Sequence, residues 1–301
     1  MKVGLNGSIV ESSEAVISVY DHGFLYGLGL FETFRTYGGR SYLLERHMER
    51  LLSGCAQLGI EFSMSVSEIE DWVARLLEEN GLPDGYVRLT VSAGEAALGL
   101  PTGDYEHPTS LLLVKELPVV QDDVHFQGRE LRLLHIKRNT PEGSIRFKSL
   151  HYMNNTLAKR ELLGLSDIVT GNNGYIAPMA GAEGLMLTEA GWLTEGIVSN
   201  LFFVSDGVVR TPSIDTGILP GVTRQRVLEL AADAGYRTEE GLYPWETLLR
   251  SEEIWMTNSI QELVPITTLT DTTFQQTIIS DGKAGEVTRK LLSLYRADTT
   301  R

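Results

Sequence analysis

The sequence predicts an α+β protein made of two domains. At 301 residues the chain is longer than one typical domain. Strand patterns and helix patterns come in blocks, which argues against the strict alternation of a doubly wound sheet. Hydrophobic residues make up 42% and charged residues 22% of the chain, as in ordinary folded proteins. We expect a smaller N-terminal domain over residues 1–120 and a larger C-terminal domain over residues 121–301, joined by the acidic, proline-bearing stretch 118–124.

The first domain is expected to contain hairpins, two helices and two longer strands. The dipeptides Asn6-Gly7 and Gly38-Gly39 separate apolar or alternating segments, so each predicts a hairpin turn. Apolar residues at helical spacing, with a glycine after the second helix, predict the helices. These helices are expected at residues 44–58 and 65–81, and the strands at residues 86–94 and 109–117.

The second domain is expected to begin with a strand and to continue as a meander of short strands. The meander covers residues 183–212 and is interrupted by turns at Ala190-Gly191 and Asp206-Gly207. A helix is expected after Lys148, and helical spacing returns near the C-terminus. The first strand is expected at residues 129–138, and the later helices at residues 223–235, 244–250 and 283–295.

The charge of the chain excludes several functions. Its formal net charge is −14 and its pI is near 4.9, whereas sequence-independent binding to nucleic acid or to an anionic membrane requires a basic surface. We therefore expect neither partner, and any anionic ligand must be held by local donors. The start of the sequence lacks the apolar run of a signal peptide, and no window approaches the roughly 18 apolar residues of a membrane span. The cytoplasm is the expected compartment.

Cysteine and histidine residues give no sign of a metal site. Cys55 is the only cysteine, and it continues the helical series Met48, Leu51 and Leu52, so it is expected in the core. The six histidines show no metal-ligand spacing. We predict no metal.

The stretch "RFKSLHYMNN", residues 146–155, surrounds Lys148 with polar residues between a predicted strand and a predicted helix. A lysine at such a place is most often part of a solvated helix start. The alternative is a chemically active amine held in a polar pocket. Other segments are needed to decide between the two.

Two glycine-containing segments are candidate phosphate sites. "GLG" at residues 27–29 does not match a dinucleotide fingerprint, because Glu32 stands where the third glycine is required. "GILPGVTRQRVLELAADAG" fits better, because Gly217 and Gly221 let the backbone turn closely before a helix that begins near Thr223. A helix N-terminus can bind a phosphate without a basic surface, although an ordinary capped helix would look the same.

Two further segments join short polar clusters to apolar strands. "TEGIVSNLFFV" carries Glu195 just before an apolar strand, where a carboxylate is either a solvated turn residue or a buried acceptor for a protonated ring nitrogen. "WMTNSIQELVPI" runs into Thr257, Asn258 and Ser259, which either cap a turn or supply hydroxyls to a phosphate. Neither segment is specific alone. With Lys148 they form a set: an amine, a phosphate cup and a carboxylate for a pyridine nitrogen.

This set resembles the fold type IV, or aminotransferase class IV, family of pyridoxal 5'-phosphate (PLP) enzymes, over nearly the whole chain. The family implies a smaller N-terminal α/β domain, a larger C-terminal domain with a mixed sheet or pseudo-barrel, the cofactor PLP, a small-molecule substrate and a homodimer. Six stretches carry the resemblance in order: "DHGFLYGLGLFETFR", "HMERL", "RFKSLHYMNNTLAKRE", "TEGIVSNLFF", "GILPGVTR" and "WMTNSIQELVPI".

The resemblance implies a role for each matching residue that contacts the cofactor. Lys148 matches the lysine that bonds the cofactor and transfers a proton, and Glu195 matches the carboxylate at the ring nitrogen. Tyr152 lies one place out of register with the tyrosine that some relatives use at the phenolic oxygen. The positions that match phosphate ligands are Arg50, Val222, Thr223 and Ser259.

For the substrate, Arg88 aligns with an arginine that holds a carboxylate in some relatives, and Glu32 and Arg35 are expected in the same pocket. "DHGFLYG" and "RNTPEGSIRFKSLHYMNN" look most like the lyases that convert 4-amino-4-deoxychorismate to 4-aminobenzoate and pyruvate in folate biosynthesis. The alternatives are a branched-chain or D-amino-acid aminotransferase on the same fold, or a protein without turnover in which these motifs are caps and turns. The spacing between Lys148 and Glu195 is longer than expected for the family, and the segment within residues 165–183 looks like an inserted loop.

Overall fold

The computed structural model describes residues 1–118, 124–165 and 176–300, and its chain forms two compact units. The N-terminal unit contains Met1–Pro118 and the short segment Phe147–His151. The C-terminal unit contains Val119–Arg146 and Tyr152–Arg301. The predicted boundary between residues 120 and 121, and much of the predicted inserted loop, lie outside the described residues.

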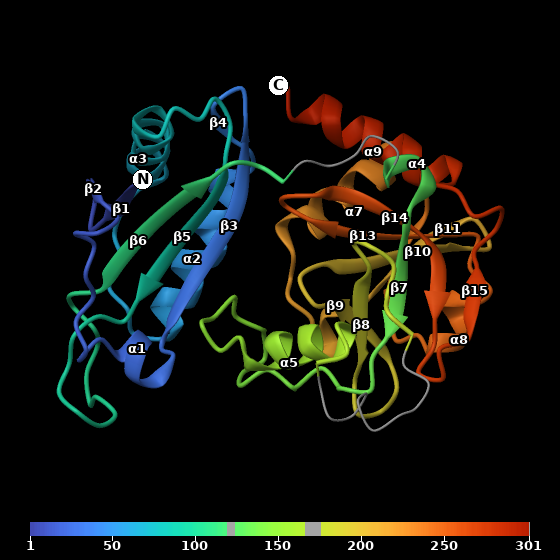
Figure 1. Ribbon diagram of the computed structural model, residues 1–301, viewed down its shortest axis with the longest axis horizontal. Coiled ribbons are helices and arrows are strands. Elements are labelled where there is room, and N and C mark those ends of the chain that lie inside the picture. Colours follow the sequence, from blue (N-terminus) through green and yellow to red (C-terminus); the bar gives the residue numbers. More distant parts are fainter. Residues whose placement is uncertain (119–123, 166–175, 301) are drawn as a thin grey trace. The chain divides into compact units, whose positions relative to one another are not determined.

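The N-terminal unit is built on a six-stranded antiparallel sheet in the order β2-β1-β6-β5-β3-β4 (Figure 1). Asn6 and Gly7 have φ values of 48° and 78°, and Gly38 and Gly39 have 58° and 78°. These left-handed conformations form the two tight turns, so both predicted hairpins are confirmed. The strands are β1 Lys2–Leu5, β2 Ser8–Glu11, β3 Gly29–Tyr37, β4 Arg40–Ser41, β5 Tyr86–Ser92 and β6 Thr109–Lys115.

Helices α2 (Leu44–Gln57) and α3 (Val66–Glu79) cover one face of this sheet. Ser65 and Glu68 form a capping box at the start of α3, and both helices agree with the sequence prediction. Cys55 is 1% exposed in the core between helices and sheet, as expected. The short helix α1 (His22–Tyr26), capped by the Asp21 side chain, was not predicted, because five residues are too few for helical periodicity to be visible.

The C-terminal unit contains a closed barrel. Strand β9 pairs with both β8 and β10, so the series β10-β13-β14-β7-β8-β9 returns to its own start. Strands β11 and β12 extend the sheet beyond β10, and β15 pairs with β14. Parallel pairs occur between β7 and β14, β7 and β8, and β11 and β12, which makes the sheet mixed. The strands are β7 Arg129–Leu133, β8 Glu183–Leu187, β9 Leu193–Gly196, β10 Asn200–Ser205, β11 Val208–Pro212, β12 Thr238–Gly241, β13 Glu253–Asn258, β14 Glu262–Thr270 and β15 Gln276–Ile278.

Helices of the C-terminal unit surround this barrel (Figure 1). Helix α5 packs on β8, and its residues Ala158 and Leu162 share one buried cluster with Met186. The predicted helix at 283–295 is observed three residues later, because Gly285 takes the extended N-cap conformation and Glu253 accepts from the first helical N–H groups. The helices are α4 Val124–Gln127, α5 Met153–Leu162, η1 (3₁₀) Ile214–Thr216, α7 Val222–Asp233, α8 Trp245–Leu248 and α9 Glu286–Asp298.

The predicted α+β class is confirmed, with a closed mixed barrel in one unit and a separate sheet in the other. None of the described helices is long and apolar enough to cross a membrane. Within the described ranges, no group of three or more His, Cys, Asp or Glu side chains could hold a metal ion.

Candidate active site

Lys148 is fixed to the N-terminal sheet by its backbone. The segment Phe147–His151 runs along β3, where the Phe31 N–H donates to the Lys148 carbonyl at 2.9 Å and the Leu150 N–H donates to the Gly29 carbonyl at 3.0 Å. The Lys148 Nζ atom lies 4.7 Å from the centre of the Phe31 ring. Strand-like pairing therefore holds this lysine, and helix α5 begins only at Met153.

Arg88 and Arg35 lie on the same face of the sheet as Phe31. Side chains alternate along β3, so Phe31 and Arg35 share a face, and Arg88 of β5 stands opposite Thr33 of that face. The Arg88 Cζ atom lies 3.6 Å from the centre of the Phe31 ring. Two cationic groups, the Lys148 amine and the Arg88 guanidinium, thus lie against one aromatic ring.

Glu32 points to the opposite, helix-covered face of β3. Its carboxylate is 1% exposed and is bound by His47 Nδ1 at 2.7 Å and by Arg50, whose Nε and Nη2 donate at 2.8 and 2.6 Å. Burial alone would raise the pKa of Glu32, but the charge of Arg50 and the hydrogen bonds from His47 and Arg50 outweigh it and lower that pKa to about 2. Burial also lowers the pKa of His47. Glu32 was expected in the substrate pocket, whereas its observed contacts fix the Arg50 guanidinium.

Glu195 is a buried acid of the C-terminal unit with hydrogen-bond donors on both of its oxygens. It is 5% exposed and lies within β9. The prediction placed Glu195 directly before the apolar strand, but a turn separates β9 from that strand, β10. Its Oε1 accepts from Arg138 Nε at 2.9 Å, and its Oε2 accepts from the Leu219 N–H at 3.0 Å and from Asn200 Nδ2 at 3.2 Å. The turn between β9 and β10 is held by Glu183, which accepts from the Ile197 N–H and the Ser199 hydroxyl at 3.0 Å each.

The N-terminus of α7 and the end of β13 bring two predicted phosphate ligands together. Thr223 Oγ1 and Ser259 Oγ are 3.2 Å apart, although they are 36 residues apart in the chain. Gly221 is the N-cap and supplies no capping side chain, and Val222 is the first helical residue. A twelve-residue helix that begins this way presents N–H groups to an anion.

Close packing and a buried hydroxyl also distinguish the region around this helix start. A Cβ atom on Gly221 would lie 2.0 Å from Asn200 Oδ1, so only glycine fits. The hydroxyl of Thr257, two residues before Ser259, is buried without a hydrogen-bond partner. A buried hydroxyl without a protein partner is able to donate to a bound ligand.

Polar residues around Lys148 have separate structural contacts. The Arg146 guanidinium donates to the Gly217 and Asn139 carbonyls, and His151 Nε2 lies 3.0 Å from the Tyr26 carbonyl. Asn155 Nδ2 donates to the Ile197 carbonyl at 2.5 Å. Tyr152 is the 38%-exposed residue before α5, and its carbonyl accepts from the Thr156 N–H.

The sequence analysis did not predict the residues that bind Glu195 and Glu32. These are Arg138, Asn200 and Leu219 for Glu195, and His47 for Glu32. Arg138 is ten positions before Lys148, and Asn200 ends the quoted "TEGIVSN" stretch, so both lie in motifs that were already singled out. Their targets are distant in the chain, and nothing local in the sequence reveals such a pairing.

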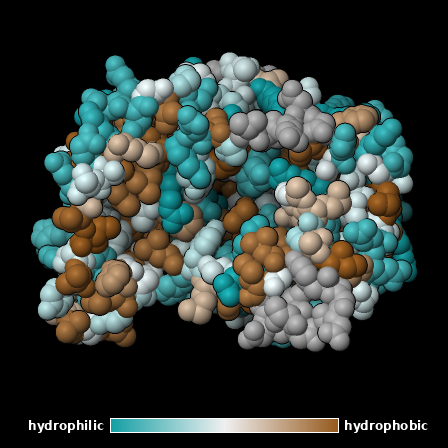
Figure 2. All heavy atoms as spheres, in the orientation of Figure 1, coloured by the Kyte–Doolittle hydropathy of each residue, from teal (hydrophilic) through white to brown (hydrophobic). Residues whose placement is uncertain are grey.

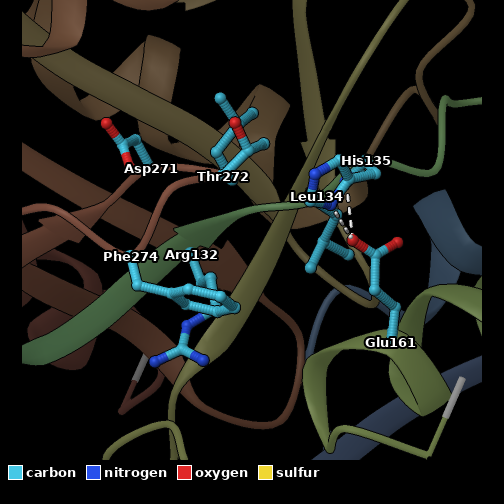
Figure 3. Close-up of a pocket in the computed structure, with 8 residues that line it drawn as sticks. Arg132, Leu134, His135, Glu161, Asp271, Thr272 and Phe274 are labelled. Atoms are coloured by element: carbon cyan, nitrogen blue, oxygen red, sulfur yellow. Dashed lines mark hydrogen bonds and ion pairs between the residues drawn. The ribbon is translucent and has the colours of Figure 1, made fainter. Parts of the chain in front are cut away.

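Among the residues that the structure describes, each unit contains a cavity. In the C-terminal unit, a cavity of about 10 Å³ lies between β7, α5 and the turn at Asp271 (Figure 3). It holds at most a water, and beside it Glu161 of α5 accepts from the His135 and Ile136 N–H groups at 2.6 and 3.0 Å. In the N-terminal unit, a cavity of about 300 Å³ lies over Thr90 and Ser92 of β5, with Leu150 in its wall.

Comparison with known proteins assigns the family. The model of the amino-transferase class IV family matches residues 29–269. Aminodeoxychorismate lyase of Bacillus subtilis (strain 168) is 41% identical over 98% of this chain and 93% of its own length. The 4-amino-4-deoxychorismate lyase from Pseudomonas aeruginosa has a TM-score of 0.79 at 26% identity, with 98% of each chain covered. The branched-chain aminotransferase from Thermoproteus uzoniensis has a TM-score of 0.82 at 25% identity, covering 100% of this chain and 95% of that one. The chain therefore belongs to the amino-transferase class IV family.

Proposed function

We propose that the protein is a PLP-dependent lyase that converts 4-amino-4-deoxychorismate to 4-aminobenzoate and pyruvate. The observation that carries the proposal is the 41% identity to the Bacillus subtilis aminodeoxychorismate lyase, which extends over 98% of the chain. Such a reaction would serve folate biosynthesis.

The residues present fit PLP. Another branched-chain amino acid aminotransferase, 27% identical to this chain, was solved with N-(5'-phosphopyridoxyl)-L-glutamate and with pyridoxamine 5'-phosphate, which are PLP derivatives. In this chain the N-terminus of α7 at Val222, with the Thr223 and Ser259 hydroxyls, would bind the phosphate, and Arg50 would add a charged contact. Glu195 would accept a hydrogen bond from the ring nitrogen, Lys148 would bond the aldehyde, and Tyr152 would contact the phenolic oxygen. When bound, PLP supplies an electron-withdrawing ring that accepts the electron pair left by proton removal.

Different residues of the protein would carry out the separate steps of the elimination. The Lys148 amine, released when the substrate amine replaces it, would take the proton from the carbon that bears the amino group. Arg88, and with it Arg35, would bind the two carboxylates of the substrate, because each buried carboxylate needs a paired donor. Glu32 would support the phosphate contact indirectly by orienting Arg50. Loss of the proton and cleavage of the bond between the ring carbon and the enolpyruvyl oxygen would leave an aromatic ring, which drives the reaction towards products. The enolpyruvate that departs would take up a proton and become pyruvate.

An aminotransferase is the second candidate, supported by the likeness to the Thermoproteus uzoniensis enzyme. A transaminase needs a keto acid to complete each cycle, whereas an elimination does not. The test is incubation of the PLP-loaded protein with 4-amino-4-deoxychorismate and no keto acid. We expect 4-aminobenzoate and pyruvate in equal amounts, and neither from Lys148→Ala. Transfer of the amino group of leucine or D-alanine to 2-oxoglutarate, with aminodeoxychorismate left intact, would establish the aminotransferase instead.

We also propose a homodimer. Large apolar side chains are exposed on the N-terminal unit, as the hydrophobic atoms around α1 in Figure 2 illustrate. Phe24 is 74% exposed, Val19 68% and Leu100 84%. Exposed clusters of this kind commonly form protein interfaces. Sedimentation equilibrium should give twice the mass of 33.3 kDa, and a single-chain mass would rule the dimer out.

A further inference from the structure

Two arginine side chains lie close to the Glu195 carboxylate. Arg138 Nε and Nη2 each lie 2.9 Å from Glu195 Oε1, and Arg146 Nε lies 4.0 Å from the same oxygen. All three side chains are less than one-tenth exposed. Two buried guanidinium groups therefore face one carboxylate. Burial, and next the charge of Arg138, lower the pKa of Arg146 to about 10, which is consistent with crowded positive charge.

Arg138 is held from its other side by the helix that follows Lys148. Its Nη1 donates to Asn154 Oδ1 at 2.7 Å, and Asn154 Nδ2 donates to the Lys137 carbonyl at 2.9 Å. Glu161 ties the same helix to the His135 N–H, as Figure 3 shows, and also accepts from the Ile136 N–H. The guanidinium thus has a fixed position beside Glu195.

Glu195 does not depend on Arg138 for its orientation. Its second oxygen is bound by the Leu219 N–H and by Asn200 Nδ2. An orienting role alone would leave Arg138 largely redundant. Its distinctive contribution is its positive charge at the first oxygen.

We propose that Arg138 weakens the hold of Glu195 on the proton of the cofactor's ring nitrogen, and thereby sets how strongly the bound ring attracts electrons. The inference rests on the proposed PLP function. A carboxylate favours a protonated ring nitrogen, and a nearby cation disfavours it, with little screening when both are buried. Arg138 acts on the ring through Glu195, by its charge and not by orienting the carboxylate.

The other charged groups near this cluster, among the described residues, do not cancel Arg138. Glu142 interacts with Arg146 and is exposed to solvent. Glu183 of β8 lies behind the turn that follows Glu195, burial raises its pKa, and Lys159 of α5 is the cation near it. Arg138 is the cation in direct contact with Glu195.

The test measures the protonation of the ring directly. The protein is loaded with PLP labelled with nitrogen-15 in the ring, and the nitrogen-15 chemical shift is followed by NMR across pH. In Arg138→Gln the midpoint of the ring-nitrogen titration should rise by about one pH unit or more. Arg138→Lys keeps the charge and should stay close to the wild type, while Glu195→Gln should lower the midpoint.

A matched control removes an equally buried ion pair elsewhere in the same unit. Arg132 is 3% exposed and donates to Glu130 at 2.7 Å, so Arg132→Gln carries a similar structural cost and should leave the midpoint unchanged. If Arg138→Gln does not fold, Asn154→Asp places a carboxylate on the far side of the same guanidinium and should raise the midpoint.

The outcomes separate this inference from the proposed function. A loaded protein whose midpoint is the same, or lower, in Arg138→Gln and Asn154→Asp overturns the inference and leaves the PLP function intact. A ring nitrogen that is protonated over the whole pH range of the wild type overturns it as well. Failure of the wild type to bind the labelled cofactor overturns both.

Discussion

At the scale of single residues, the environment of Lys148 supports the proposal that this lysine bonds PLP. Its backbone is paired with β3, and its amine lies over Phe31. Borohydride treatment of the PLP-loaded protein should therefore attach the pyridoxyl group to Lys148, as read by peptide mapping. Label on Lys115, Lys137 or Lys159 would refute the assignment. Lys148→Ala should retain part of the cofactor affinity, because the phosphate contacts remain, and should lose nearly all turnover.

Arg50 is the second residue whose role can be tested alone. Glu32 holds its guanidinium with two hydrogen bonds, which orders it before any ligand arrives. Arg50→Ala should weaken PLP binding at least tenfold, since a charge-assisted hydrogen bond contributes about 1.5 to 3 kcal/mol. Glu32→Gln should have a smaller effect in the same direction. Arg75→Ala removes an exposed arginine of α3 and is the control; equal affinity in Arg50→Ala and Arg75→Ala would exclude a phosphate contact.

At the scale of elements, the start of α7 depends on the fit between Gly221 and Asn200. An alanine at position 221 keeps the ordinary φ of −67°, but its Cβ would lie 2.0 Å from Asn200 Oδ1. The displaced Asn200 would lose its bond to Glu195, and the helix start would shift at a cost of about 1 to 3 kcal/mol. Gly221→Ala should therefore weaken PLP binding in a fluorescence titration. Gly143→Ala, which adds a Cβ in open space, should bind normally; similar affinities for the two variants would contradict this view of α7.

At the scale of the whole molecule, the buried group of Glu32, His47 and Arg50 predicts loss of stability in acid. The pKa of Glu32 is lowered to about 2 in the folded state, so the unfolded chain takes up the proton first and stability falls as pH drops from near 4.5 towards 2. The lowered pKa of His47 acts in the same direction, beginning as pH falls below 6.5. The Glu32 contribution is about 2 to 4 kcal/mol.

Urea unfolding of the apoprotein at pH 7, 5 and 3 measures this dependence. The free energy of unfolding should decrease with falling pH, and the decrease between pH 5 and pH 3 should be smaller in Glu32→Gln, which has no proton to take up. Equal slopes in the wild type and Glu32→Gln would assign the acid sensitivity to other carboxylates.

The sequence by itself determined those features that depend on neighbouring residues. Tight turns at Asn6-Gly7 and Gly38-Gly39, the capped helix after Ser65 and the buried position of Cys55 follow from backbone conformation and side-chain period, which act over a few residues. Motifs around Lys148, Glu195 and Thr223 were likewise visible, because each is contiguous.

Only the tertiary structure decided which side chains hold these motifs in place. Arg138 reaches Glu195 across 57 positions because its backbone bonds to Leu187 of β8, which pairs with β9. Thr223 approaches Ser259 across 36 positions because α7 packs against β13. Glu32 faces Arg50, since it stands on the helix-covered face of β3. Strand order and the orientation of packed faces are set by how the whole core excludes water, and no short stretch of sequence records that arrangement.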